Sequence, residues 1–173
     1  MSAIRIEIGA IEVHTFTTVA ACRIAGFDRQ RLNDDIASGI YPCAPHGRAG
    51  VARTFDHDDL VGLHIYATLC QEFRFGKPYA AQLACEVIKS LKNPNLSEDL
   101  NRIDIPMNGL PGHSRCHRDD PTHFYASYGG STVGSDFAAI SFDLDGIRKR
   151  LQSRIDEEVQ EHKRISNIVG GYD

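Results

Sequence analysis

Four positions close together in the first third of the chain carry side chains rich in hydrogen-bond donors: Arg29, Gln30, Arg31 and Asn33. Arginine can donate two parallel hydrogen bonds to guanine, so this set suits the reading of base edges. The histidines at positions 57 and 64 have no nucleophile or paired acid at a diagnostic spacing, so we expect no enzyme. These residues therefore predict the recognition of nucleic-acid bases by hydrogen bonds, and not catalysis.

The donor-rich positions fall in the second of two short predicted helices. Thr17 or Thr18 can cap the first helix, and Gly26 can end it in a left-handed conformation. Asp28 can cap the second helix, which ends near Gly39. A short helix of this kind fits the major groove of DNA, with its N-terminal residues at the base edges.

The segment after these helices is rich in turn residues. Between Tyr41 and the apolar run from Val51 to Phe55, the sequence His-Gly-Arg-Ala-Gly at 46–50 predicts a two-stranded hairpin. An arginine-bearing hairpin beside such a helix can reach phosphates or the minor groove.

The remaining elements follow from periodicity and turn signals. An alternating pattern at 4–8 predicts a strand, and Asp56 and Pro78 open two further helices, the second reaching Leu91. Residues 95–121 are rich in loop signals, with a strand at 102–107, and strands at 124–127 and 137–144 suggest a small antiparallel sheet. Asp145 can cap a last helix. We place a domain boundary at residue 94, which gives an α+β chain with domains 1–94 and 95–173.

Several sequence blocks in the first part carry a family resemblance. They are 17–28, Leu32, 39–42, 53–56 and 58–60. Together they resemble the winged helix-turn-helix DNA-binding domain of the MerR family, over residues 16–91. The resemblance implies that 28–38 is a recognition helix, that Arg48 and Arg53 lie in a wing, and that Arg23 contacts the DNA backbone.

The positions expected to contact DNA are therefore Thr18, Arg23, Arg29, Gln30, Arg31, Asn33, His46, Arg48 and Arg53. Three features depart from the family pattern. The recognition helix carries the acidic pair Asp34 and Asp35, the wing is lengthened by residues 43–50, and no long dimerisation helix follows the fourth helix.

Charge and cysteine usage set limits on the class of protein. The net charge of the 173-residue chain is −4 at pH 7, so DNA contacts must come from a local basic face. Residues 16–55 supply one, with five arginines against three aspartates. Five scattered cysteines favour free thiols over a disulfide framework. With no signal sequence and no apolar run long enough to span a bilayer, we expect a cytoplasmic protein.

Two other clusters resemble ligand sites. His113, Cys116, His117 and His123 include zinc-type ligands at a non-standard spacing, and we interpret them as loop residues. The glycine-rich run at 129–135 lacks the lysine of a phosphate loop and predicts a hairpin connection. We therefore expect no metal and no cofactor.

The last helix carries an apolar stripe, Ile147, Leu151, Ile155 and Val159, that could pair two chains or cover a sheet in one chain. We expect a homodimer bound to double-stranded DNA, acting in transcription regulation. An excisionase-like architectural factor is the first alternative. A protein-interaction adaptor that has lost DNA affinity is the second, and the acidic pair at 34–35 favours it.

Overall fold

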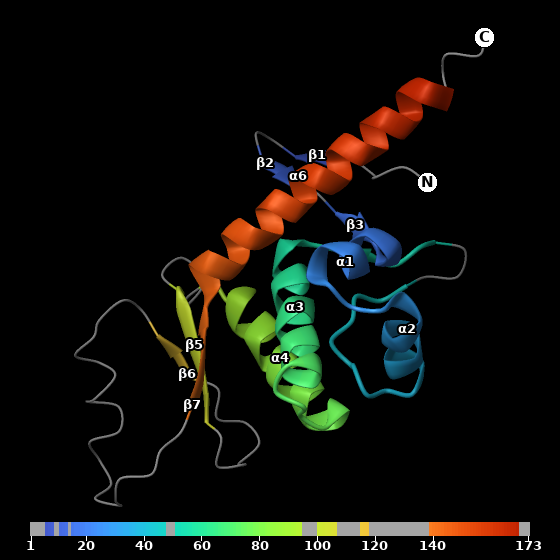
Figure 1. Cartoon of the computed structure of the whole chain (residues 1–173). Coiled ribbons are helices and arrows are strands. Elements are labelled where there is room, and N and C mark those ends of the chain that lie inside the picture. The colour runs from blue at the N-terminus through green and yellow to red at the C-terminus, as the bar shows by residue number, and fades with distance from the viewer. Residues whose placement is uncertain are drawn as a thin grey trace, which may run out of the picture.

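A computed structural model describes residues 6–8, 11–13, 15–47, 51–94, 100–106, 115–117 and 139–169. This part of the chain is a mixed helix-and-sheet structure, compatible with the predicted α+β class. Helices α1 to α4 pack together, a three-stranded sheet lies at one end, and the long helix α6 crosses from the sheet over α1 and α3 (Figure 1).

Helices α1 (Thr18–Ala25) and α2 (Arg29–Ala37) form where their end signals predict. The Thr17 hydroxyl caps α1, and the Asp28 carboxylate caps α2 by accepting from the Arg31 N–H at 2.8 Å. Gly26 ends α1 with φ at +77°, a conformation that other residues adopt only with strain. The turn between the helices is therefore encoded locally.

The predicted hairpin between residues 41 and 55 differs from the structure. Strand β4 (Thr54–Phe55) pairs antiparallel with β3 (Phe16–Thr17), which precedes α1, and not with the segment after Tyr41. Tyr41 is instead buried against Tyr66 of α3, with ring centroids 4.9 Å apart. Burial of this large aromatic side chain outweighs the turn pattern, so the described residues 41–47 and 51–53 do not pair as a two-stranded hairpin.

Helices α3 (His57–Gln71) and α4 (Lys77–Leu91) form the centre of the core. Asp56 opens α3 as predicted and forms a capping box with Asp59, because each of the two carboxylates accepts from the other's backbone N–H. Lys92 pairs with both carboxylates, at 2.9 and 2.7 Å. At the helix contact, a Cβ on Gly62 would overlap the Ile88 side chain, so the close approach requires glycine.

The remaining described strands form two small sheets. β1 (Ile6–Ile8), part of the predicted strand at 4–8, pairs with β2 (Ile11–Val13) in an antiparallel hairpin. In the other sheet β5 (Arg102–Pro106) lies between β6 (Arg115–His117) and β7 (Ala139–Asp143), with antiparallel neighbours on both sides. The strands predicted at 102–107 and 137–144 correspond to β5 and β7, and the one at 124–127 lies outside the described residues.

Helix α6 (Leu144–Val169) follows β7 directly. Its first-turn acceptor is Asp143, which binds the Gly146 N–H at 3.0 Å, and not Asp145 as the sequence suggests. The apolar stripe of α6 packs within the chain, since α6 contacts α1, α3 and the sheet. The buried stripe residues are Ile147, Leu151 and Ile155, with Val159 partly buried beside them. Core residues on both sides of position 94 thus join one cluster.

One expectation about the cysteines is wrong. Cys43, in the loop after α2, forms a disulfide with Cys85 of α4, across 42 positions. No spacing motif marks the pair, so only the fold brings the two sulfurs together. Cys22 and Cys70 are free thiols, as predicted. None of the described helices combines the length and the apolar composition needed to cross a bilayer.

Candidate nucleic-acid interface

The four donor-rich positions of α2 are all exposed. Arg29 and Asn33 are four residues apart and so share one side of the helix, with Gln30 next to them. Arg31 lies on the other flank, on the side of Asp35. Neither Arg29 nor Arg31 forms an ion pair with another described residue, and both side chains are exposed.

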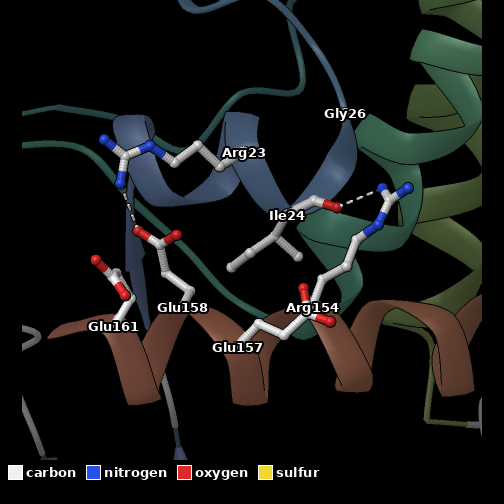
Figure 2. A pocket seen from close by; sticks show the side chains of 7 residues that line it. All are labelled: Arg23, Ile24, Gly26, Arg154, Glu157, Glu158 and Glu161. Atoms are coloured by element: carbon white, nitrogen blue, oxygen red, sulfur yellow. Dashed lines mark hydrogen bonds and ion pairs between the residues drawn. The ribbon is translucent and has the colours of Figure 1, made fainter. Parts of the chain in front are cut away.

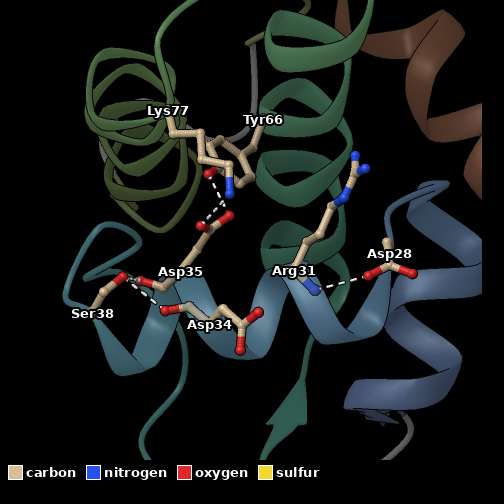
Figure 3. Close-up of polar contacts among 7 residues, drawn as sticks. All are labelled: Asp28, Arg31, Asp34, Asp35, Ser38, Tyr66 and Lys77. Atoms are coloured by element: carbon tan, nitrogen blue, oxygen red, sulfur yellow. Dashed lines mark hydrogen bonds and ion pairs between the residues drawn. The ribbon is translucent and has the colours of Figure 1, made fainter.

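The acidic pair of α2 separates into one exposed and one buried carboxylate. Asp35 points toward α3 and α4, where it accepts hydrogen bonds from Lys77 Nζ at 2.7 Å and Tyr66 Oη at 2.9 Å (Figure 3). Asp34 points the other way, into solvent. The Asp35 side chain is only 2% exposed.

This arrangement changes how the acidic pair is interpreted. Asp35 anchors α2 to the core and its charge is paired, so it does not oppose DNA at the surface. Only Asp34 remains on the outer face, beside Gln30. Sequence reasoning missed Lys77 and Tyr66, because their partner lies 42 and 31 positions away. The one sequence signal for this contact is that Asp35 lies on the same side of α2 as the apolar Leu32, which indicates a buried position.

The turn between α1 and α2 is held from outside by three side chains. Carbonyl oxygens of Ile24, Ala25 and Gly26 bond with Arg154 of α6, His64 of α3 and Gln71 of α3, at 2.9, 3.1 and 3.3 Å. Because the last carbonyls of a helix have no partner within it, these bonds fix the end of α1 and the direction in which α2 leaves.

His64 is affected by its place in this contact. Burial lowers the pKa of its imidazole, although its bond with the Ala25 carbonyl acts in the opposite direction. The nearby positive charges of Arg154 and Arg150 lower the pKa further. The neutral ring is therefore the form that the folded protein favours.

Arg23, expected to contact the DNA backbone, faces α6 instead. Its Nη1 donates to Glu158 Oε1 at 2.9 Å, as Figure 2 shows. The two residues belong to an open groove of about 510 Å³ between α1 and α6, whose α6 side also carries Glu157 and Glu161. A phosphate approaching Arg23 would have to replace Glu158 and meet this acidic wall.

The remaining residues that were expected to contact DNA differ in their exposure and in their contacts. His46 is exposed, whereas Arg53 is half-buried and donates from Nε to the Pro45 carbonyl at 2.6 Å. That bond joins the two arms of the loop, residues 45–47 and 51–53, which project on the same side of the protein as α2 (Figure 1). Arg48 lies outside the described residues. Thr18 is half-buried as the first residue of α1.

The structure describes only part of the cluster of His113, Cys116, His117 and His123, which were interpreted from the sequence as loop residues. Cys116 and His117 lie in strand β6, opposite Ile103 and Arg102 of β5, and not in a loop as expected. His113 and His123 lie outside the described residues. Among the described side chains, no group of three or more metal-ligating residues comes together.

No protein-family model matches this chain, and no curated protein is significantly similar to it. The resemblance to the MerR domain therefore depends on the sequence blocks given above. The geometry of α1, α2 and the loop is the basis for a functional proposal.

Proposed function

We propose that this chain is a sequence-specific double-stranded DNA-binding protein that regulates transcription, with a MerR-like helix-turn-helix as its reading element. Its α2 helix enters the major groove, and the arms of the 41–53 loop contact the backbone alongside. The observation that carries the proposal is that α2 exposes Arg29, Gln30, Arg31 and Asn33 while its opposite side is fixed to the core.

The fixed side of α2 matters because base reading requires a rigid helix. The Asp28 cap and the Asp35–Lys77 pair hold α2 near its start and near its end, and the bonds to the α1–α2 turn fix where the helix begins. Side chains presented in this way lose little freedom on binding, which favours affinity. Arg29, Gln30 and Asn33 can then donate to bases or to nearby phosphates.

Asp34 has a place in this interface despite its charge. A carboxylate in the major groove can accept a hydrogen bond from the amino group of cytosine. Asp34 stands beside Gln30 on the exposed face, so we propose that it selects cytosine. Replacing Asp34 by alanine should then remove that preference and raise affinity for unrelated sequences.

Two parts of the earlier expectation change. Arg23 is not included among the DNA contacts, because Glu158 occupies it. The stripe of α6 is covered by α1 and α3, so we do not propose dimerisation through it. A single reading helix offers a small interface, and we propose that two copies bind together through another surface.

Selection of bound sequences from a random duplex pool tests the proposal directly. We expect an enriched site containing a cytosine, which Asp34→Ala no longer selects. A palindromic site would indicate two copies, since operator symmetry mirrors protein symmetry. Recovery of an unselected pool at low salt would contradict sequence-specific reading. Strong bending of the selected duplex would favour the architectural factor, and protein capture without duplex binding would favour the adaptor.

A further inference from the structure

The Cys43–Cys85 disulfide lies at the base of the loop that we place against DNA. Cys43 follows α2 by six positions, and its Cα stands 5.3 Å from that of Cys85 in α4. Two residues further on, the Pro45 carbonyl accepts the Arg53 hydrogen bond that joins the loop arms. The covalent link therefore sits where the chain leaves the core and enters the loop.

The surroundings of the two sulfurs differ. Cys85 is buried in α4, whereas Cys43 is half-buried and can be approached from solvent. Thiol–disulfide exchange needs such access to one sulfur, since a thiolate must attack along the S–S axis. The sulfur of Cys85 is therefore shielded from a reductant, whereas the sulfur of Cys43 is accessible to one.

The free thiols differ from this pair in their chemistry. Burial, aided by the charge of Asp28, raises the pKa of Cys22 to about 11, and burial also raises the pKa of Cys70. Since the thiolate is the reactive form, both are poor partners in exchange. Among the cysteines whose side chains are described, Cys43 and Cys85 are the ones suited to redox chemistry.

We propose that the Cys43–Cys85 disulfide is a reversible redox site that controls the order of the loop arms at 43–47 and 51–53 and, through them, the affinity for DNA. The second part rests on the proposed function. The reductant is a dithiol: one thiolate attacks the sulfur of Cys43, the S–S bond breaks, and Cys85 leaves as a thiolate that takes up a proton. The second thiol of the reductant then releases Cys43 and becomes oxidised in a dithiol-derived disulfide.

Reduction should loosen the loop without releasing α2. Tyr41 and Ala44 are buried and remain packed on the core, and Asp35 still pairs with Lys77. After reduction, the hydrogen bond from Arg53 to the Pro45 carbonyl is the one described side-chain bond that still links the two arms beyond Ala44. His46 and Arg53 then become less pre-ordered, which lowers affinity for the backbone.

Hydrogen exchange of the full chain, oxidised and after dithiothreitol, tests the redox site without reference to DNA. We expect the backbone amides at 43, 44, 46, 47 and 51–53 to exchange about tenfold faster after reduction, while those of α2, α3 and α4 keep their rates. Reoxidation should restore the slow exchange, and Cys43→Ser should show the fast rates in both conditions. Cys70→Ser, a half-buried thiol outside the pair, should behave as wild type. Equal loop exchange in both redox states would overturn the inference, as would alkylation of Cys43 and Cys85 in air-oxidised protein.

Titration of the same samples with a selected duplex tests the consequence. Reduction should weaken binding by about three- to tenfold, and Cys43→Ser should bind weakly in both states. A loosened loop with unchanged DNA affinity would overturn the control of binding. If the oxidised protein retains no duplex while its loop still responds to reduction, the proposed function fails and the redox site stands.

Discussion

The exposed face of α2 and the contact between α1 and α6 both present arginines, but their surroundings differ. Arg29 of α2 has no ion-pair partner among the described residues. Arg23 of α1 is equally exposed and is held by Glu158, 135 positions away. The comparison teaches that the availability of a surface arginine depends on what packs beside its helix. In this protein α6 pairs with Arg23 and leaves Arg29 without an ion pair among the described residues.

The two regions also differ in what fixes them. α2 is anchored from its buried side by one carboxylate, Asp35, bound to Lys77 and Tyr66. The end of α1 is anchored through its own carbonyl oxygens, which bond with side chains of α3 and α6. Loss of one partner should therefore have a larger effect at α2, where a buried charge would be left alone.

Lys77→Met tests the anchor of α2 and should have the largest effect. The variant leaves the buried Asp35 carboxylate without its cation, and we expect a loss of about 2–3 kcal/mol in the free energy of unfolding, measured with urea. Lys89→Met changes an exposed lysine of the same helix and should alter stability by less than about 0.5 kcal/mol. Similar losses in both variants would mean that the pair does not anchor α2.

Arg29→Ala and Arg23→Ala test whether the two arginines have different roles. Loss of a base contact should reduce discrimination between a selected and a scrambled duplex by about 1–3 kcal/mol for Arg29→Ala. Arg23→Ala should leave discrimination and the salt dependence of binding unchanged, because Glu158 already engages that side chain. Competition binding at several salt concentrations measures both. A reduced salt slope for Arg23→Ala would return that residue to the interface.

Arg154→Ala tests the contact between α1 and α6. The variant removes the donor to the Ile24 carbonyl, and we expect a loss of about 1 kcal/mol in the free energy of unfolding. Lys149→Ala, on an exposed position of α6, is the matched control and should have little effect. If the two variants unfold at the same urea concentration, the bond contributes nothing measurable.

His64→Gln tests the pH dependence of the α1–α2 turn and should give the smallest effect. The pKa of His64 is lower in the folded chain than its value of 6.5 in the unfolded chain. Well above pH 6.5 the ring is neutral in both states, so the full free energy of unfolding is present there. As the pH falls below the unfolded value, protonation favours the unfolded chain and stability is lost.

The variant should therefore lose less stability than wild type between about pH 7.5 and about pH 5.5, in urea titrations at each pH. An unchanged dependence in His64→Gln would assign the acid sensitivity to other groups.

Local signals predicted the helices of the first half well. The Thr17 and Asp28 side chains accept from backbone N–H groups three residues further on, and the Gly26 N–H donates to the Cys22 carbonyl. These bonds set the ends of α1 and the start of α2, so neighbouring residues suffice to find them. The capping box at Asp56 and Asp59 is equally local. These features depend on contacts between residues three or four positions apart.

Long-range pairings could not be predicted from the sequence. The acidic pair at 34–35 has no local sign that one carboxylate meets Lys77, and Cys43 has no motif that selects Cys85. The stripe of α6 indicated a buried face without indicating its partner, which is α1 and α3 of the same chain. The exposed polar residues of α2 were therefore identified from the sequence, but the anchors of α2 and the pairing of Arg23 with Glu158 required the fold.

The bond from Arg154 to the Ile24 carbonyl has a consequence for synthesis of the protein. Its partners are 130 positions apart, so a ribosome working at roughly 5–20 residues per second makes Arg154 on the order of ten seconds after Ile24. During that interval α1 and α3 lack the helix that covers them, and apolar surface is open to chaperones or to aggregation. Synthesis of α6, and not the emergence of α2, is then the step that completes the packing around α1 and α3.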